Sequence, residues 1–222
     1  MTFTHIAHPV IEQLQQINSP TGRTYQTPDG KKYPSITTVL GADPEKKKIL
    51  EAWRAKVGEE EAARISVQAS RRGTRIHSMC EDYLNNWNPY SRAMPIDVET
   101  FNSIKPILDE SIDNIYCQEQ RLFSHHLGVA GTVDCIAHYN GVRSVIDFKT
   151  SAKPKREDWI TQYFIQECAY AIMWEERTKQ PITQLVTIIA VDNHEPQVFV
   201  QHRDEWSTSL IDAIKVYHNT VC

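Results

Sequence analysis

The sequence predicts an α/β fold in which a mixed central sheet is flanked by helices, with a further helical region before the sheet. The first half of the chain shows mainly helical spacing of apolar residues, and the second half changes to three strands, a helix, two strands and a helix. At 222 residues, with 41% hydrophobic and 23% charged residues, the chain suits one globular domain. We expect a single domain over 1–222, in which 1–115 form a hairpin and helical region and 116–222 form the α/β core.

The first predicted elements are a hairpin and four helices. Residues 22–34 form the hairpin, because the Thr-Pro-Asp-Gly segment at 27–30 is a strong turn signal. Ser35 is a suitable N-cap and Gly41 a suitable end for a short helix. The longer helices that follow are expected at 44–57, 59–84 and 97–115.

The core elements are strands rich in apolar residues and two further helices. Asn140 and Gly141 mark a turn between the second and third core strands. The expected strands are 116–124, 128–139, 143–150, 184–192 and 196–202, and the expected helices are 157–178 and 204–218.

Two carboxylates and a lysine lie on neighbouring predicted strands. Asp147 and Lys149 project to the same side of their strand, and the turn before them can bring Asp134 beside Asp147. An Asp-x-Lys pair on a solvated strand face is common, but these runs are apolar, and charges in such runs rarely lack a partner. Two converging carboxylates would bind a hard divalent cation next to the lysine. This arrangement is what metal-assisted hydrolysis of a phosphodiester requires.

Two helices carry further candidate residues. His77 and Glu81 share one face of the 59–84 helix, and Gln162, Gln166 and Tyr170 share one face of the 157–178 helix. Each pattern alone is more often structural than functional, and Glu81 can equally be a solvated residue or an acceptor for His77.

Taken in order, these motifs resemble the RecB-like branch of the PD-(D/E)xK nuclease superfamily, whose core is restriction-endonuclease-like. The motifs are Gly-x-x-x-His ending at His77, Gly-x-x-Asp ending at Asp134, Asp147-x-Lys149, and Gln166-x-x-x-Tyr170. The Pro-Ser-Ile-Thr segment at 34–37 is similar to one in the mitochondrial genome maintenance exonuclease family and its phage-encoded relatives. The resemblance covers about 33–202, and Val133 stands where the superfamily name has proline.

The resemblance implies a role for each matching residue. Asp134, Asp147, His77 and the backbone carbonyl of Phe148 would hold Mg²⁺ or Mn²⁺, and the His77 nitrogen suits Mn²⁺ better. Lys149 would assist the chemistry together with the two aspartates. Related enzymes place helices such as those at 35–88 as an arch over the active site. The residues expected to contact DNA are Ser35, Thr37, Arg71, Arg72, Arg75, Thr150, Lys153, Lys155, Gln166 and Tyr170.

The predicted function is a metal-dependent exonuclease that acts on single-stranded DNA with a free end. Because the formal net charge is −4, DNA binding must come from local basic clusters, which include Lys46, Lys47 and Lys48. The alternatives are a non-catalytic DNA-end-binding module and a restriction-type endonuclease. Five scattered cysteines without a Cys-x-x-Cys pair argue against a zinc or iron–sulfur site and favour reduced thiols. We expect a cytoplasmic protein without a membrane span, in the bacterial host if it is phage-encoded; the sequence identifies no protein partner.

Overall fold

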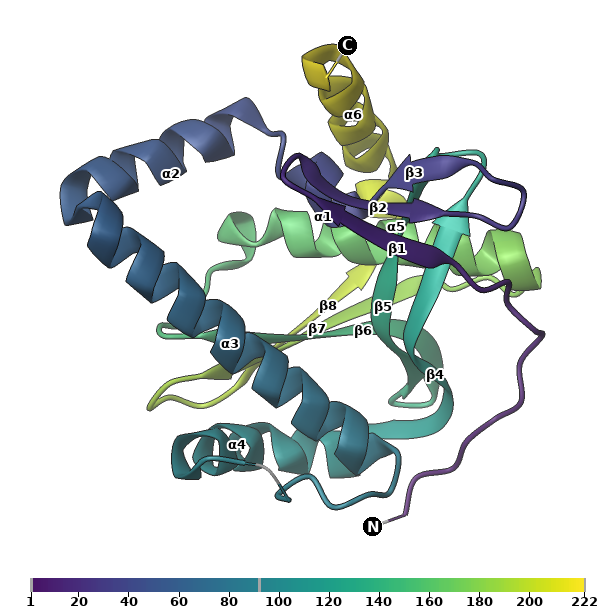
Figure 1. The fold of residues 1–222 in the computed structure, drawn as a ribbon. Helices are drawn as coiled ribbons and strands as arrows, with labels where there is room; N and C mark the ends of the chain where they lie inside the picture. The colour runs from purple at the N-terminus through teal and green to yellow at the C-terminus, as the bar shows by residue number, and fades with distance from the viewer. Residues whose placement is uncertain (1, 92, 222) are drawn as a thin grey trace.

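The computed structural model describes residues 2–91 and 93–221, and it shows the expected mixed α/β architecture (Figure 1). The central sheet has the strand order β4-β5-β6-β7-β8, and only the β6–β7 pair is parallel. A second, three-stranded antiparallel sheet comes from the N-terminal region. The strands are β1 (Gln15–Ser19), β2 (Gly22–Gln26), β3 (Lys32–Pro34), β4 (Ile112–Ser124), β5 (Val129–Tyr139), β6 (Val142–Ser151), β7 (Gln184–Val191) and β8 (Gln197–His202).

Helices cover both faces of the central sheet. The third and fourth helices pack on one face and the fifth on the other, where the sixth and the short first helix join it (Figure 1). Strand alternation divides the core accordingly, since Cys135 belongs to the first face and Ile136 to the second. The helices are α1 (Ile36–Leu40), α2 (Pro44–Val57), α3 (Glu59–Leu84), α4 (Pro95–Ser111), the 3₁₀ turn η1 (Glu157–Trp159), α5 (Thr161–Thr178) and α6 (Arg203–Val221).

The β5–β6 hairpin places the central motif. Asn140 and Gly141 have φ values of 50° and 81°, which fit a two-residue type I′ turn. The antiparallel register runs from Tyr139 opposite Val142 to Cys135 opposite Ile146. The next positions along this register are Asp134 and Asp147, so the turn brings the two carboxylates to neighbouring strands.

Several predicted boundaries were wrong. Strand β1 was not predicted, because its polar sequence gives no apolar alternation. The helix predicted at 97–115 begins at Pro95 and ends at Ser111. Ile112 instead pairs with Tyr139 in the sheet, and this tertiary pairing overrides the helical spacing of the isoleucines there. The helix predicted from 157 begins at Thr161, after η1.

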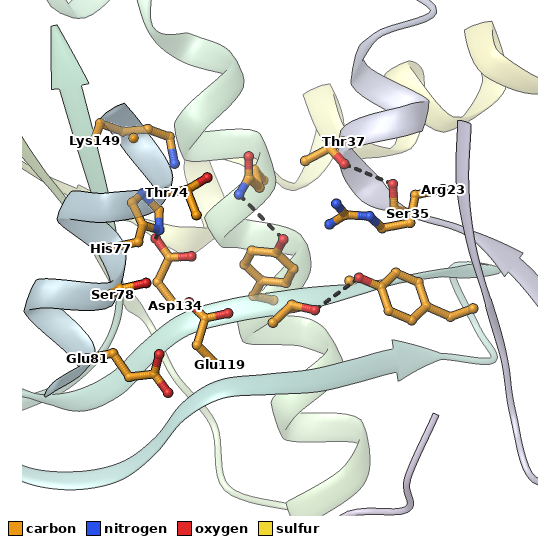
Figure 2. Close-up of a pocket in the computed structure, with 16 residues that line it drawn as sticks. Arg23, Ser35, Thr37, Thr74, His77, Ser78, Glu81, Glu119, Asp134 and Lys149 are labelled. Carbon is orange, nitrogen blue, oxygen red and sulfur yellow. Dashed lines mark hydrogen bonds and ion pairs between the residues drawn. The ribbon is translucent and has the colours of Figure 1, made fainter. Parts of the chain in front are cut away.

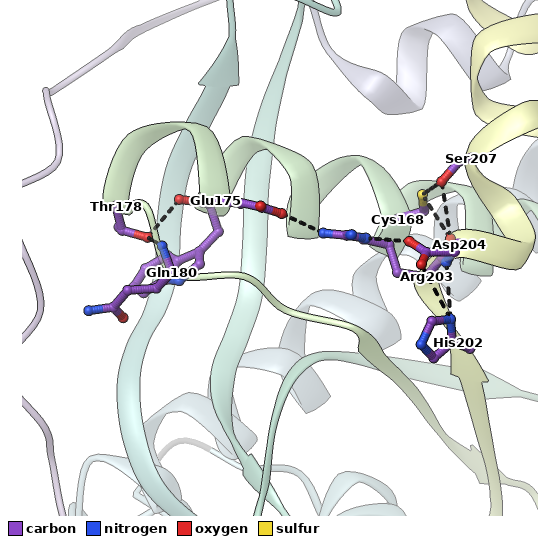
Figure 3. A network of polar contacts seen from close by, with 9 residues as sticks. Cys168, Glu175, Thr178, Gln180, His202, Arg203, Asp204 and Ser207 are labelled. Atoms are coloured by element: carbon purple, nitrogen blue, oxygen red, sulfur yellow. Dashed lines mark hydrogen bonds and ion pairs between the residues drawn. The ribbon is translucent and has the colours of Figure 1, made fainter.

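Polar contacts fix α5 against the start of α6 (Figure 3). Arg203 donates to a Glu175 carboxylate oxygen at 2.5 Å and to the Asp204 carboxylate at 3.0 Å. The Cys168 thiol donates to the Arg203 carbonyl oxygen at 3.5 Å. The helix that carries Gln166 and Tyr170 is therefore held from its far side.

One part of the molecule stands away from both sheets. Every residue of α2 is at least partly exposed, and residues 63–71 of α3 are exposed around the whole helix. The two helices meet at a bend, where Gly58 has a φ of 90° (Figure 1). We call α2 together with residues 59–71 the arch.

Cys80, Cys117, Cys135 and Cys168 are buried free thiols, while Cys222 lies outside the described residues. Among the helices that the structure describes, none is long and apolar enough to cross a membrane.

Candidate active site

A cavity of about 660 Å³ lies between α3, the central sheet, α5 and the N-terminal sheet (Figure 2). It gathers residues that the sequence motifs place far apart in the chain. Asp147 lies just beneath its surface with 1% of its area exposed. The predicted site residues that line the cavity are Ser35, Thr37, His77, Asp134, Lys149, Gln166 and Tyr170.

Asp134 connects the hairpin to α3. Its Oδ2 accepts a hydrogen bond from the backbone N–H of Phe148 at 3.0 Å, which fixes the carboxylate over β6. The same oxygen lies 3.3 Å from Nδ1 of His77. The structure therefore brings together the histidine and the first aspartate of the predicted metal set.

Asp147 and Lys149 lie on the same side of β6, as strand alternation predicted, and they form an ion pair in which the carboxylate is buried and the lysine is half-buried. Gln166 donates from Nε2 to Oδ1 of Asp147 at 3.2 Å, and the same amide lies 3.4 Å from the Tyr170 hydroxyl. Burial raises the pKa of Asp147, and the Lys149 charge opposes this effect. Burial acts to lower the pKa of Lys149, but the charges of Asp147 and Asp134 outweigh it and raise that pKa. The lysine is therefore held in its charged form.

Glycine in the Gly-x-x-Asp motif has a packing reason. A Cβ atom on Gly131 would lie 2.6 Å from Cε1 of Tyr170 and 3.0 Å from its hydroxyl oxygen. Real contacts are never this short, so only glycine lets the tyrosine ring lie against β5. The Gly-x-x-Asp and Gln-x-x-x-Tyr motifs thus depend on each other, because Tyr170 in turn contacts Gln166.

Glu119 is a candidate ligand that the sequence analysis missed. One donor atom each from His77, Glu119 and Asp134 lie within 4.8 Å of one another. Glu119 has a φ of 47°, a backbone conformation that costs energy in a strand and often occurs at functional sites. Partial burial of its carboxyl and the charges of Asp134, Glu81 and Asp147 raise the pKa of Glu119 to about 7. The pairing of β4 with β5 could have signalled it, because Glu119 falls opposite Asp134.

This donor set fits a divalent cation. Carboxylate oxygens are ligands for Mg²⁺ and Mn²⁺, and an imidazole nitrogen favours Mn²⁺. The raised carboxyl pKa of Glu119 also reflects negative charge that a bound cation would relieve. The residues placed to hold the ion are His77, Glu119 and Asp134, with Asp147 directly beneath.

The predicted basic DNA contacts lie outside the cavity lining. Arg72 forms an ion pair with Asp192, and Arg75 contacts the fully buried Asp97 at 2.6 Å. These pairs attach α3 to α4 and to the end of β7, so both arginines have a structural role. The other predicted contacts outside the lining are the exposed Arg71 and Lys153 and the half-buried Thr150 and Lys155.

The fold and the candidate cation ligands are compatible with a nuclease centre, and comparison with known families agrees. The model of the PD-(D/E)XK nuclease superfamily matches residues 5–216, so the chain belongs to that superfamily.

Within the superfamily, the chain is similar to mitochondrial genome maintenance exonuclease 1. It is 31% identical to the Mus musculus protein over 129 residues and 29% identical to the Homo sapiens protein over 133 residues. The Xenopus tropicalis protein is 29% identical over 129 residues. These matches cover 55% of this chain and 37–38% of each relative, so the chain spans well under half of their length.

Proposed function

We propose that this nuclease is a metal-dependent exonuclease that hydrolyses phosphodiester bonds from the ends of single-stranded DNA. The observation that carries the proposal is the meeting of His77, Glu119 and Asp134 in one cavity beside the Asp147–Lys149 ion pair. The three relatives described above are named as exonucleases, which supports the same activity.

Each residue has a definite task in this proposal. His77, Glu119 and Asp134, with Asp147 and the Phe148 carbonyl, would hold Mg²⁺ or Mn²⁺. The bound ion supplies activation of water and stabilisation of charge on the phosphate. Lys149, kept charged by its neighbours, would neutralise oxygens of the scissile phosphate. Gln166 holds the Asp147 carboxylate, and Tyr170 holds Gln166 in turn.

The preference for single strands rests on the arch. It carries Lys46, Lys47, Lys48 and Arg71 and also Trp53, and an aromatic ring among cations suits flexible, unstacked bases. His77 lies on the same helix as the second half of the arch. A DNA strand that entered beneath the arch would therefore come close to the candidate metal ligands. We propose that a free end passes beneath the arch. Arg71, Thr150, Lys153 and Lys155 would contact the backbone outside the cavity, whereas Arg72 and Arg75 mainly position α3.

The decisive experiment uses end-labelled single-stranded DNA and a closed circle of the same sequence. We expect nucleotide release from the linear strand with Mg²⁺ or Mn²⁺, no release with chelator, and an intact circle. Asp134→Asn should abolish release, while Asp158→Asn, an exposed acid outside the cavity, should not. Binding without hydrolysis by pure wild-type protein would indicate a DNA-end-binding module, and rapid cleavage of the circle would indicate an endonuclease.

Metal binding can be measured without catalysis. Calorimetric titration with Mn²⁺ should show weaker binding for Glu119→Gln and His77→Ala than for wild type, by about tenfold or more. Asp158→Asn should match wild type. An unchanged Mn²⁺ titration in Glu119→Gln would remove that residue from the ligand set.

The setting of the activity is also a proposal. We place it in DNA replication, repair or recombination, or in phage genome processing, in the cytoplasm of the cell or the bacterial host. The relatives carry mitochondrial names, so fractionation of a tagged protein in its native cells is the test.

A further inference from the structure

The cavity has a second end, away from the candidate metal ligands His77, Glu119 and Asp134. Arg23 on β2 lies there with Ser35 and Thr37 at the start of α1, across the cavity from His77 and Asp134 (Figure 2). The cavity lining also includes the Tyr25 and Thr132 hydroxyls, which lie 3.0 Å apart. The metal end is acidic, and this end offers a cation and hydroxyls.

The backbone at Arg23 is held firmly in place. Its carbonyl oxygen accepts from the Ser35 backbone N–H at 2.8 Å and from the Thr38 hydroxyl at 3.1 Å, and its own N–H donates to that hydroxyl at 3.0 Å. Gly22, with a φ of 131°, allows this approach, because a Cβ atom there would lie 2.5 Å from the Thr38 side chain. The position of the Arg23 backbone relative to α1 is thus fixed.

The Arg23 guanidinium, in contrast, is uncommitted. Among the residues that the structure describes, no acid forms an ion pair with it and no side-chain hydrogen bond involves it. Arg72, Arg75 and Arg203 all bind acidic partners. The charge of Arg23 still reaches into the cavity, because it acts to lower the pKa of Glu119. An arginine fixed at its backbone and free at its head is available for an anionic ligand.

The neighbouring hydroxyls extend this donor group. The Ser35 and Thr37 hydroxyl oxygens lie 2.8 Å apart, and buried Ser35 also accepts from the Thr38 backbone N–H at 3.0 Å. Thr37 is exposed to the cavity and can donate outward. A planar guanidinium with an adjacent hydroxyl matches the oxygens of a phosphate group.

We propose that Arg23, Ser35 and Thr37 form a second phosphate-binding subsite, which holds a phosphate of the cleaved strand other than the scissile one. The inference rests on the proposed function and deepens it, since two fixed phosphates would set the position of the strand over the metal cluster. The ligand is either a terminal phosphate monoester or a neighbouring phosphodiester, which have the same recognition chemistry.

The test measures binding of fluorescent single-stranded oligonucleotides in an Asp134→Asn background, so that no strand is cut. Arg23→Gln should weaken binding about tenfold and lower the salt dependence by about one phosphate contact. Lys32→Gln, a charge removal on the same small sheet outside the cavity lining, is the matched control and should have little effect. Arg23→Lys should recover part of the affinity.

Neutral methylphosphonates at successive positions locate the phosphate. At one position, the methylphosphonate should weaken binding by the protein that retains Arg23. The same methylphosphonate should cause no further loss in Arg23→Gln, because the two changes remove the same contact. A 5′- or 3′-phosphate that binds better than the hydroxyl end only when Arg23 is present would identify a terminal monoester. Losses that add at every position, or equal binding by Arg23→Gln and Lys32→Gln, would overturn the subsite.

These results are independent of the catalytic proposal. Thermal unfolding should be unchanged and Mn²⁺ binding should be retained in Arg23→Gln, which separates a DNA-binding role from a folding defect. If the wild-type protein failed to hydrolyse DNA while these binding results held, the exonuclease proposal would fail and the subsite would stand.

Discussion

The β5–β6 hairpin and the arch place charged residues in opposite environments. Asp147 on β6 is 1% exposed and its partner Lys149 is half-buried at the cavity, whereas residues 63–71 of the arch are exposed around the whole helix. The charges of the hairpin have fixed partners and little freedom, and most of those of the arch face solvent. Groups suited to chemistry are thus held in place by fixed partners, while groups suited to guiding a strand need no core around them.

The two regions also differ in what stabilises them. Burial of the Asp147 carboxylate removes it from water, a cost that the ion pair with Lys149 only partly offsets. The arch instead relies on local helix signals. Asp43 caps α2 through the Glu45 backbone N–H at 2.9 Å, and Arg64 pairs with Glu61 at 2.6 Å. Substitutions should therefore act on chemistry and stability in the hairpin and mainly on DNA affinity in the arch.

The largest expected effect is that of replacing Lys149, the half-buried lysine of the hairpin. Lys149→Met should lower the rate of DNA hydrolysis by about 10²–10³, because it removes the charge nearest the scissile phosphate. Lys47→Met in the arch removes the same charge and should change the rate by only about twofold. Single-turnover assays at saturating DNA compare the two variants. A Lys149→Met rate within tenfold of wild type would contradict a catalytic role for the hairpin lysine that the arch lysines lack.

The hairpin was predictable because its signals are local. Asn140-Gly141 dictates the turn, and the two-residue period of a strand dictates that Asp147 and Lys149 share a side. The helices of the arch were likewise predicted at 44–57 and 59–84, because cap residues and Gly58 mark their ends. The mixed sheet followed from the order of the elements.

The roles of several other residues could not be predicted, because they depend on tertiary placement. Glu119 joins the candidate metal ligands only through the pairing of β4 with β5, which a pattern within one strand does not reveal. Arg23 reaches the cavity only because the N-terminal sheet docks beside α1. The basic residues Arg72 and Arg75 looked available for DNA, but their acidic partners lie 120 and 22 residues away.

Replacement of two glycines, Gly131 on β5 and Gly73 on α3, should change the free energy of unfolding in opposite directions. Gly131→Ala should lower the free energy of unfolding by about 1–3 kcal/mol, because the new Cβ overlaps the Tyr170 ring. Gly73→Ala, whose Cβ would lie 3.9 Å from the Thr150 hydroxyl, should raise it by about 0.5–1 kcal/mol through helix propensity. Urea denaturation measures both. Equal effects of the two substitutions would contradict the packing role of Gly131.

The buried acid Glu167 should make the free energy of unfolding depend on pH. Glu167 is fully buried beside Thr187. Burial is the main cause that raises its pKa well above the usual value, and the charge of Asp147 raises that pKa further. The unfolded chain releases this proton above about pH 4.3, but the folded protein retains it. The free energy of unfolding should therefore fall as pH rises above 5, and Glu167→Gln should reduce that fall by up to about 1.4 kcal/mol per pH unit. Urea denaturation at pH 5, 6 and 7 tests this, with exposed Glu51→Gln in the arch as control. Parallel pH profiles for wild type and Glu167→Gln would argue against a buried neutral acid.

The smallest effect is expected in the arch. The double variant Lys47→Glu, Arg71→Glu should bind single-stranded DNA several-fold more weakly and lower the magnitude of the salt-dependence slope by about 1.4, which corresponds to two phosphate contacts. Lys215→Glu on α6, outside the arch, should leave both quantities unchanged. Because these arch residues face solvent, the free energy of unfolding should stay within about 0.5 kcal/mol of wild type. A salt slope equal to that of wild type would show that the strand does not pass along the arch, even if the hairpin performs hydrolysis as proposed. Bulky groups at both DNA ends provide the complementary test, since they should stop digestion only if a free end must pass beneath α2 and α3.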